Sequence, residues 1–172
     1  MTIDFKKLNL QDALDIAISI EEEANERYTE FANGVGSRYK GDAGEFFSNM
    51  AKFELKHAKE LGEKRKKLFK DAPSKIAPLN IWNVEAPDHG VARTYMSPRQ
   101  AAQVALAAEK KAYSFFDDAI KHIDDAEVKA LFTALREEEK QHQKMVEDLL
   151  KRLPEQEGPD LDDDDIDEPP AL

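Results

Sequence analysis

Apolar residues return every three or four positions along four long stretches of this chain, and polar residues fill most positions between them. That spacing gathers the apolar side chains on one face of an α-helix, so it predicts four amphipathic helices. The predicted helices span residues 10–33, 43–69, 97–123 and 124–153.

Residues typical of helix ends flank these stretches. Asn9 is expected to cap the first helix, and Gly34 and Gly36 to end it. The other three helices begin with a capping residue that is followed, three positions later, by Glu or Gln. These starts are Asp42 with Glu45, Ser97 with Pro98 and Gln100, and Asp124 with Glu127.

The lengths of the connections predict how the helices are joined. About nine residues link the first two helices and almost none link the last two, so each pair is expected to form an antiparallel hairpin. Residues 70–96 lie between the pairs and are long enough to cross the whole bundle. The chain is therefore predicted to be all-α, a ferritin-like four-helix bundle with a long crossover between helices two and three. Trp82, in the crossover, is expected to pack against the bundle.

A carboxylate interrupts each apolar face near its middle, and in two helices a His follows three residues later on the same face. A single Glu-x-x-His is weak evidence, but two of them on apolar faces, with a Glu at the same level of each remaining helix, form a specific pattern. The residues are Glu21, Glu54, His57, Glu109, Glu139 and His142.

Burial of these groups needs compensation by positive charge. An unpaired charge in a bundle core costs several kcal/mol. Lys64 is the only basic residue on the four apolar faces. Two divalent cations would offset four carboxylates, and neutral imidazoles would complete their coordination, so we predict a dinuclear metal site. A buried polar network or a water-filled groove without metal is the alternative.

Composition narrows the class of protein. The absence of Cys excludes disulfides, thiolate zinc sites and iron–sulfur clusters, and it is compatible with the cytoplasm, where we expect the protein. No charge-free run is long enough to span a membrane, and the N-terminus does not have the pattern of a signal peptide.

The negative charge is concentrated at the C-terminal end. Residues 154–172 hold nine acidic and no basic residues, which leaves residues 1–153 with a net charge of −2 out of −11. We expect a bundle domain at 1–153 and an acidic, disordered tail at 154–172 that keeps the protein in solution, docks a partner or attracts iron. This charge distribution argues against nucleic acid and anionic membranes as partners.

The motifs resemble those of the ferritin-like di-iron carboxylate superfamily, and most of all its rubrerythrin branch, over residues 10–153. The motifs are Glu21-x-x-Ala24-x-x-x-Tyr28, Glu54-x-x-His57, Glu109-x-x-Ala112-x-x-x-Phe116 and Glu139-x-x-His142. The resemblance implies that Glu21 and Glu109 are terminal ligands, that Glu54 and Glu139 bridge two metal ions, and that His57 and His142 each bind one ion.

Two features depart from that branch. The chain has no Cys-rich rubredoxin-like module, and Ala112 stands where rubrerythrins usually have an extra Glu. A stand-alone site with six ligands, as in bacterioferritin, fits the ligand count better.

Ligation by oxygen with one imidazole per ion suits Fe(II) or Mn(II). We predict a di-iron oxidoreductase that oxidises Fe(II) with O₂ or H₂O₂, as a ferroxidase or peroxide-consuming enzyme in iron homeostasis or oxidative-stress protection. Glu54, Glu139 and Tyr28 are the predicted catalytic residues; Tyr28 either bonds a ligand carboxylate or fills the core. The electron donor is unknown, and a homodimer is expected. The alternatives are a non-catalytic iron-binding or iron-delivery protein and a purely structural bundle.

Four other carboxylates and two His are expected away from the site. They occupy solvated or inter-helix positions: Glu22, Glu23, Glu137, Glu138, His89 and His122.

Overall fold

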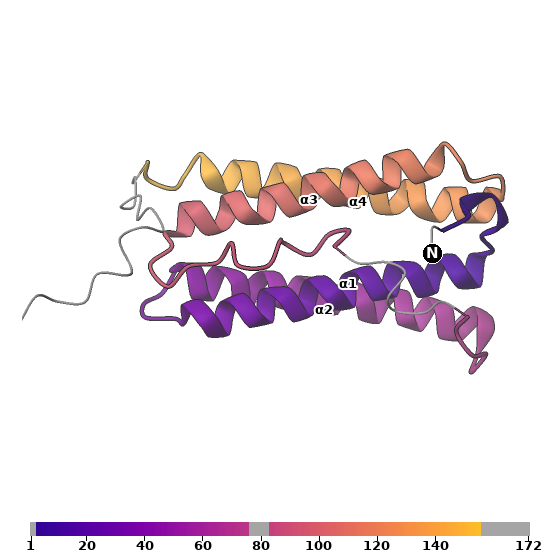
Figure 1. Cartoon of the computed structure of the whole chain (residues 1–172), viewed down its shortest axis with the longest axis horizontal. Helices are drawn as coiled ribbons and strands as arrows, with labels where there is room; N and C mark the ends of the chain where they lie inside the picture. The colour runs from indigo at the N-terminus through magenta and orange to yellow at the C-terminus, as the bar shows by residue number, and fades with distance from the viewer. Residues whose placement is uncertain (1–2, 76–82, 156–172) are drawn as a thin grey trace, which may run out of the picture.

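The computed structural model describes residues 3–75 and 83–155. Within them the chain forms a short 3₁₀ turn and four α-helices, with no β-strand (Figure 1). The elements are η1 (Phe5–Lys7), α1 (Leu10–Val35), α2 (Ala43–Phe69), α3 (Pro98–Ile120) and α4 (Ala126–Leu150). The predicted all-α class and the four helices are therefore confirmed. Trp82 and most of the acidic tail lie outside the described residues.

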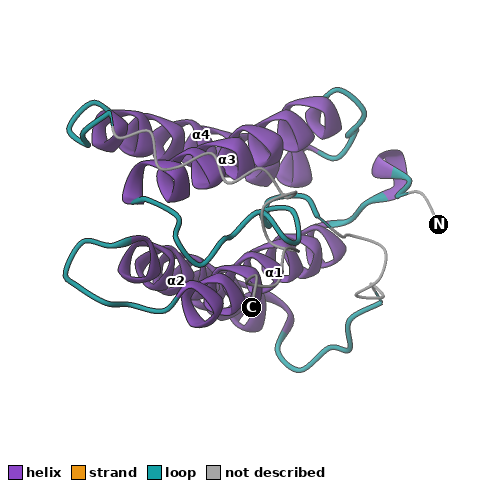
Figure 2. Ribbon diagram, turned by 60° about the vertical axis from the view of Figure 1, so that its left-hand side comes forward, coloured by secondary structure: helices purple, strands orange, loops and turns teal. Residues whose placement is uncertain are grey.

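The helices form two antiparallel hairpins, α1 with α2 and α3 with α4, that face each other along their length (Figure 1). The end of α2 and the start of α3 lie at opposite ends of the bundle (Figure 1), and the described part of the connection between them runs between the two hairpins (Figure 2). This is the connectivity that the lengths of the three loops predict. No helix within the described ranges is long and apolar enough to cross a membrane.

Side-chain caps set the helix starts. The Asn9 side chain accepts a hydrogen bond from the backbone N–H of Asp12, and Ser97 forms a full capping box with Gln100. The fourth helix differs from the prediction by one position. Its cap is Asp125 rather than Asp124, because the Asp125 carboxylate is the one that accepts from the first backbone amides of α4.

The turn between α1 and α2 is held by Asp42. Its carboxylate accepts hydrogen bonds from the backbone amides of Arg38, Tyr39 and Glu45. These donors stabilise the charged form and lower the pKa of Asp42 to about 2. The turn also needs Gly36, whose φ of 69° lies in the left-handed region that favours glycine.

The core is divided into two apolar clusters, which both include residues from the two hairpins. One cluster contains Leu14, Ile20, Phe116 and Phe132, and the other contains Tyr28, Phe31 and Phe47. The predicted ligand on α1, Glu21, lies between Ile20 of the first cluster and Ala24 of the second. The polar layer therefore lies between two apolar blocks.

From residue 64 onward, α2 buries a different face from the one that the apolar pattern predicts. Lys64 is exposed and Leu68 is half exposed, whereas Arg65 points to α1 and donates to the Asp15 carboxylate at 2.5 Å. The one basic residue expected on an apolar face is therefore in solvent. No lysine or arginine remains on those faces to offset the buried carboxylates.

Candidate metal centre

The six residues singled out by the sequence come together in the middle of the bundle, in two clusters of three. In each cluster one potential ligand atom per residue lies within 4.8 Å of the others. The first cluster comes wholly from the α1–α2 hairpin and the second wholly from the α3–α4 hairpin. The clusters are Glu21–Glu54–His57 and Glu109–Glu139–His142.

The spacing of three residues places Glu and His on one helix face in both α2 and α4. His57 Nδ1 lies 3.7 Å from an oxygen of Glu21 and 3.7 Å from an oxygen of Glu54. His142 Nδ1 lies 3.2 Å from Glu109 and 3.8 Å from Glu139. The two clusters thus repeat the same arrangement of two carboxylates around one imidazole.

The two imidazole rings stack on each other at the boundary between α2 and α4. Their centroids are 4.9 Å apart and their planes differ by 6°. Phe53 contacts both rings edge-on, with centroids 6.0 Å from His57 and 6.4 Å from His142. The imidazoles are about 15% exposed, so this is the side on which the site lies nearest to solvent.

The carboxylates are buried and short of hydrogen-bond donors. Glu21, Glu54, Glu109 and Glu139 are each at most 3% exposed. Both oxygens of Glu54 and one oxygen of each other carboxylate have no hydrogen-bond partner. A buried polar atom without a partner costs about 1–3 kcal/mol, more if it is charged. Such oxygen-rich clusters, each with one imidazole, are compatible with a di-iron site.

The excess of negative charge shifts the proton affinities of the cluster. Burial raises the pKa of Glu21 to about 7, and burial followed by repulsion from Glu109 raises the pKa of Glu139. The carboxylates of Glu21 and Glu54 raise the pKa of His57 to about 10. Burial alone would lower the pKa of His142, but the Glu109 carboxylate raises it above its ordinary value. Cations bound here would replace those protons.

Tyr28 is fully buried beside the clusters. Its ring stacks on Phe47 with centroids 6.1 Å apart, and its hydroxyl has no hydrogen-bond partner. Burial, followed by the charges of Glu109 and other nearby carboxylates, raises its pKa well above the ordinary value. Tyr28 was expected either to bond a ligand carboxylate or to fill the core, and the structure shows it filling the core.

Sequence reasoning missed Glu85, which lies in the crossover and is 1% exposed. Its carboxylate lies within 4.8 Å of ligand atoms from both clusters. The crossover has no helical period that could reveal which way its side chains point. One signal was present, because Glu85 is the first charge after the nine uncharged residues 76–84.

The other flanking groups lie mostly where they were expected. Glu22, Glu137, Glu138, His89 and His122 are exposed. Glu23 is the exception, since it is 6% exposed and accepts hydrogen bonds from the backbone of Asn83. Glu23 is therefore neither solvated nor between two helices, as expected, but buried against the crossover.

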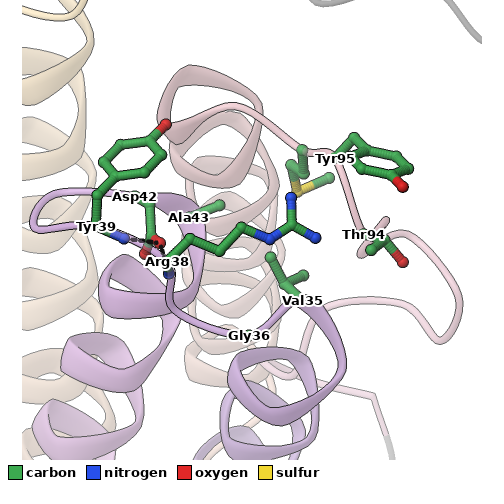
Figure 3. Close-up of a pocket in the computed structure, with 9 residues that line it drawn as sticks. Val35, Gly36, Arg38, Tyr39, Asp42, Ala43, Thr94 and Tyr95 are labelled. Atoms are coloured by element: carbon green, nitrogen blue, oxygen red, sulfur yellow. Dashed lines mark hydrogen bonds between the residues drawn. The ribbon is translucent and has the colours of Figure 1, made fainter.

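A cavity of about 100 Å³ lies at the α1–α2 turn, beside Val35 and Tyr95 (Figure 3). Arg38 extends across it towards Tyr95, with its guanidinium carbon 5.2 Å from the ring centroid (Figure 3). Asp42, which also lines it, is already occupied as the cap of α2. Of the charged groups of this cavity, Asp42 therefore holds the turn, and Arg38 contacts the crossover through Tyr95.

Comparison with known proteins agrees with this geometry. The model of the family described as Rubrerythrin matches residues 12–150. The chain also resembles the crystal structure of an uncharacterized conserved protein from Magnetospirillum magnetotacticum MS-1. The two are 26% identical, with a TM-score of 0.66, over 87% of this chain and 98% of the other. No curated protein matches the sequence.

Proposed function

The chain belongs to the rubrerythrin family, and on that premise we propose that its bundle binds two Fe(II) ions and passes their electrons to O₂ or H₂O₂. Reduction of one H₂O₂ to two water molecules takes two electrons and two protons. One pair of Fe(II) ions supplies those electrons and becomes a pair of Fe(III). The protein would thus act as a ferroxidase or peroxide-consuming enzyme.

The main support for the proposal is that the two clusters around the Glu-x-x-His pairs are buried, lie next to each other and have too few hydrogen-bond donors for their carboxylates. Four carboxylates carry a charge of −4, which two divalent cations offset, and each cluster adds one neutral imidazole. Structural zinc prefers closed tetrahedral sites with sulfur or nitrogen ligands, whereas this donor set suits Fe(II), with Mn(II) as the competing ion.

The two clusters support the proposed pairing of terminal ligands, and the resemblance to di-iron proteins supports the two shared carboxylates. Glu21 and His57 would bind one ion, and Glu109 and His142 the other. Glu54 and Glu139 would be shared between the ions. A pair of adjacent iron ions supplies two-electron chemistry that no side chain of this chain can supply.

The surrounding residues would control access to the pair. The apolar clusters on both sides of the polar layer would exclude water, and this would strengthen the electrostatic interactions inside. Phe53 is 42% exposed and lies against both imidazoles, so it would cover the side on which a small oxidant approaches. Tyr28, on the α1 side, is proposed as a catalytic residue beside the carboxylates.

An anaerobic Fe(II) titration followed by oxidant tests the proposal. We expect two Fe(II) bound per chain, followed by loss of Fe(II) when O₂ or H₂O₂ is added to separate samples. Ferrozine colour measures the remaining Fe(II), and the faster oxidant identifies the acceptor. Glu139→Ala and His57→Ala should abolish dinuclear binding, whereas Glu137→Ala, at an exposed position beside Glu139, should bind as the wild type does.

The other outcomes separate the alternatives. Two equivalents bound without oxidation would favour an iron-binding or iron-delivery protein. Absence of stoichiometric binding would leave a structural bundle. Equal loss in all three variants would show that the proposed ligands are wrong.

A further inference from the structure

The crossover is fixed to α1 on both sides of Glu85. The Glu23 carboxylate accepts hydrogen bonds from the backbone N–H of Asn83, at 3.1 and 3.0 Å to its two oxygens. The buried guanidinium of Arg27 donates to the backbone carbonyl of Pro87. Two buried side chains of one helix thus hold the segment two residues before and two residues after Glu85.

A second anchor comes from α3. The Lys111 ammonium donates to the backbone carbonyl of Ala86 at 2.7 Å and pairs with Asp88 at 3.2 Å. Val84 and Ala86, on either side of Glu85, are buried. The crossover therefore lies against α1 and α3, between the hairpins (Figure 2), and Glu85 is fixed in the interior.

The carboxylate of Glu85 has anions for neighbours and no donor. It is 1% exposed, and neither of its oxygens has a hydrogen-bond partner. One set of ligand atoms within 4.8 Å joins it to Glu21 and Glu139, and a second set joins it to Glu54 and Glu109. A fifth carboxylate aimed into four others is strongly unfavourable unless cations lie between them.

We propose that Glu85 is a seventh ligand of the dinuclear site and reaches both ions. Each set that contains Glu85 combines one carboxylate from the first cluster with one from the second. The ligand would come from the crossover, whereas the other six come from helices. This inference rests on the proposed function for the presence of a metal pair, and it adds a residue that the helical pattern does not predict.

A fifth carboxylate changes which oxidation state the site favours. With two divalent ions, five carboxylates leave a net charge of −1 where four would leave none. With two trivalent ions, five leave +1 where four would leave +2. Glu85 therefore stabilises the oxidised pair relative to the reduced pair, and its removal should raise the reduction potential of bound iron.

Co(II) binding to Glu85→Gln tests the assignment without turnover. Gln keeps the size of the side chain but removes its charge, and the visible spectrum of Co(II) reports coordination. We expect Glu85→Gln to lose about tenfold or more in affinity for at least one ion and to change the spectrum. Glu137→Gln is the matched control, because it makes the same substitution at an exposed position that does not touch the crossover, and it should bind as the wild type does.

Thermal unfolding separates a ligand from a structural residue. In chelator-treated protein Glu85→Gln should melt at or above the wild-type temperature, because a buried carboxylate without a partner has been removed. With Co(II) added, the rise in melting temperature should be smaller than in the wild type. If Glu85→Gln does not fold, Glu85→Asp keeps the charge, draws the carboxylate back by one methylene, and should still change the Co(II) spectrum.

Two results would overturn the assignment of Glu85 but leave the proposed function standing. One is a wild type and a Glu85→Gln variant that both bind two Co(II) with equal affinity and equal spectra. The other is a variant equally destabilised with and without metal, which would mark Glu85 as structural. A wild type that binds fewer than two ions would overturn the proposed function as well, so the two failures are distinguishable.

Discussion

Without metal, the stability of the folded protein should fall as the pH rises from 5 to 8. Burial raises the pKa of Glu21 from 4.5, the value of an exposed glutamate, to about 7. Between those values the folded chain holds a proton that the unfolded chain has released. Stability of the folded state therefore falls as the pH rises through this window. His57, Glu85 and Glu139 also have raised pKa values, so they act in the same direction.

The size of the effect follows from Glu21 alone. A shift of 2.5 pKa units at about 1.4 kcal/mol per unit corresponds to about 3 kcal/mol, and the interval from pH 5 to pH 8 covers most of it. For a chain of this length that loss lowers the melting temperature by about 5–10 °C. The pKa of Asp42 is lowered to about 2, so its contribution to the stability of the folded state is lost only in acid, below this interval.

Urea unfolding of chelator-treated protein at pH 5, 6, 7 and 8 measures the slope of the free energy of unfolding against pH. In Glu21→Gln the fall in this free energy from pH 5 to pH 8 should be about 2–3 kcal/mol smaller than in the wild type. With Fe(II) bound under anaerobic conditions the slope should change sign, because metal and protons compete for the same oxygens. A chelator-treated wild type as stable at pH 8 as at pH 5, or a Glu21→Gln variant with the wild-type slope, would refute the reasoning.

Three further predictions concern the rest of the bundle. Gly44→Ala should lower the free energy of unfolding in urea by about 1–3 kcal/mol, because the new Cβ would lie 2.3 Å from the backbone oxygen of Gly36. Gly34→Ala is the control: its Cβ would meet nothing within 4 Å, so it should raise that free energy by up to about 1 kcal/mol. Tyr28→Phe should keep or raise the stability of metal-free protein, because it removes a buried hydroxyl that has no partner, but it should slow Fe(II) oxidation in stopped-flow measurements. Arg65→Ala should cost about 1–3 kcal/mol in thermal unfolding, because it leaves the buried Asp15 carboxylate without its donor.

Much of the fold could be predicted from the sequence because its determinants are local. The apolar period and the caps at Asn9, Asp42 and Ser97 depend on residues within a few positions of one another. The same is true of the Glu-x-x-His pairs, whose spacing already places both side chains on one helix face. The predicted cap of the fourth helix was wrong by one residue. Asp124 and Asp125 are both good capping residues, and only the backbone conformation decides between them.

The rest depends on contacts between distant segments. Glu85 and Glu23 are buried because the crossover folds back on α1, about 60 residues away along the chain, and no local period records that contact. Leu68 lies on the predicted apolar face of α2, yet it is half exposed because the described elements do not extend to cover that end of the helix. Tertiary structure, rather than helix preference, decides both cases.

The assignment of each cluster to a single hairpin makes this bundle modular. Either hairpin alone carries two glutamates and one histidine in the same spatial order. Two copies of one hairpin, placed face to face, would repeat the complete set of helix donors. A gene that encodes one such hairpin therefore contains half of the helix ligands, and its tandem duplication would supply the other half without any new substitution at those positions.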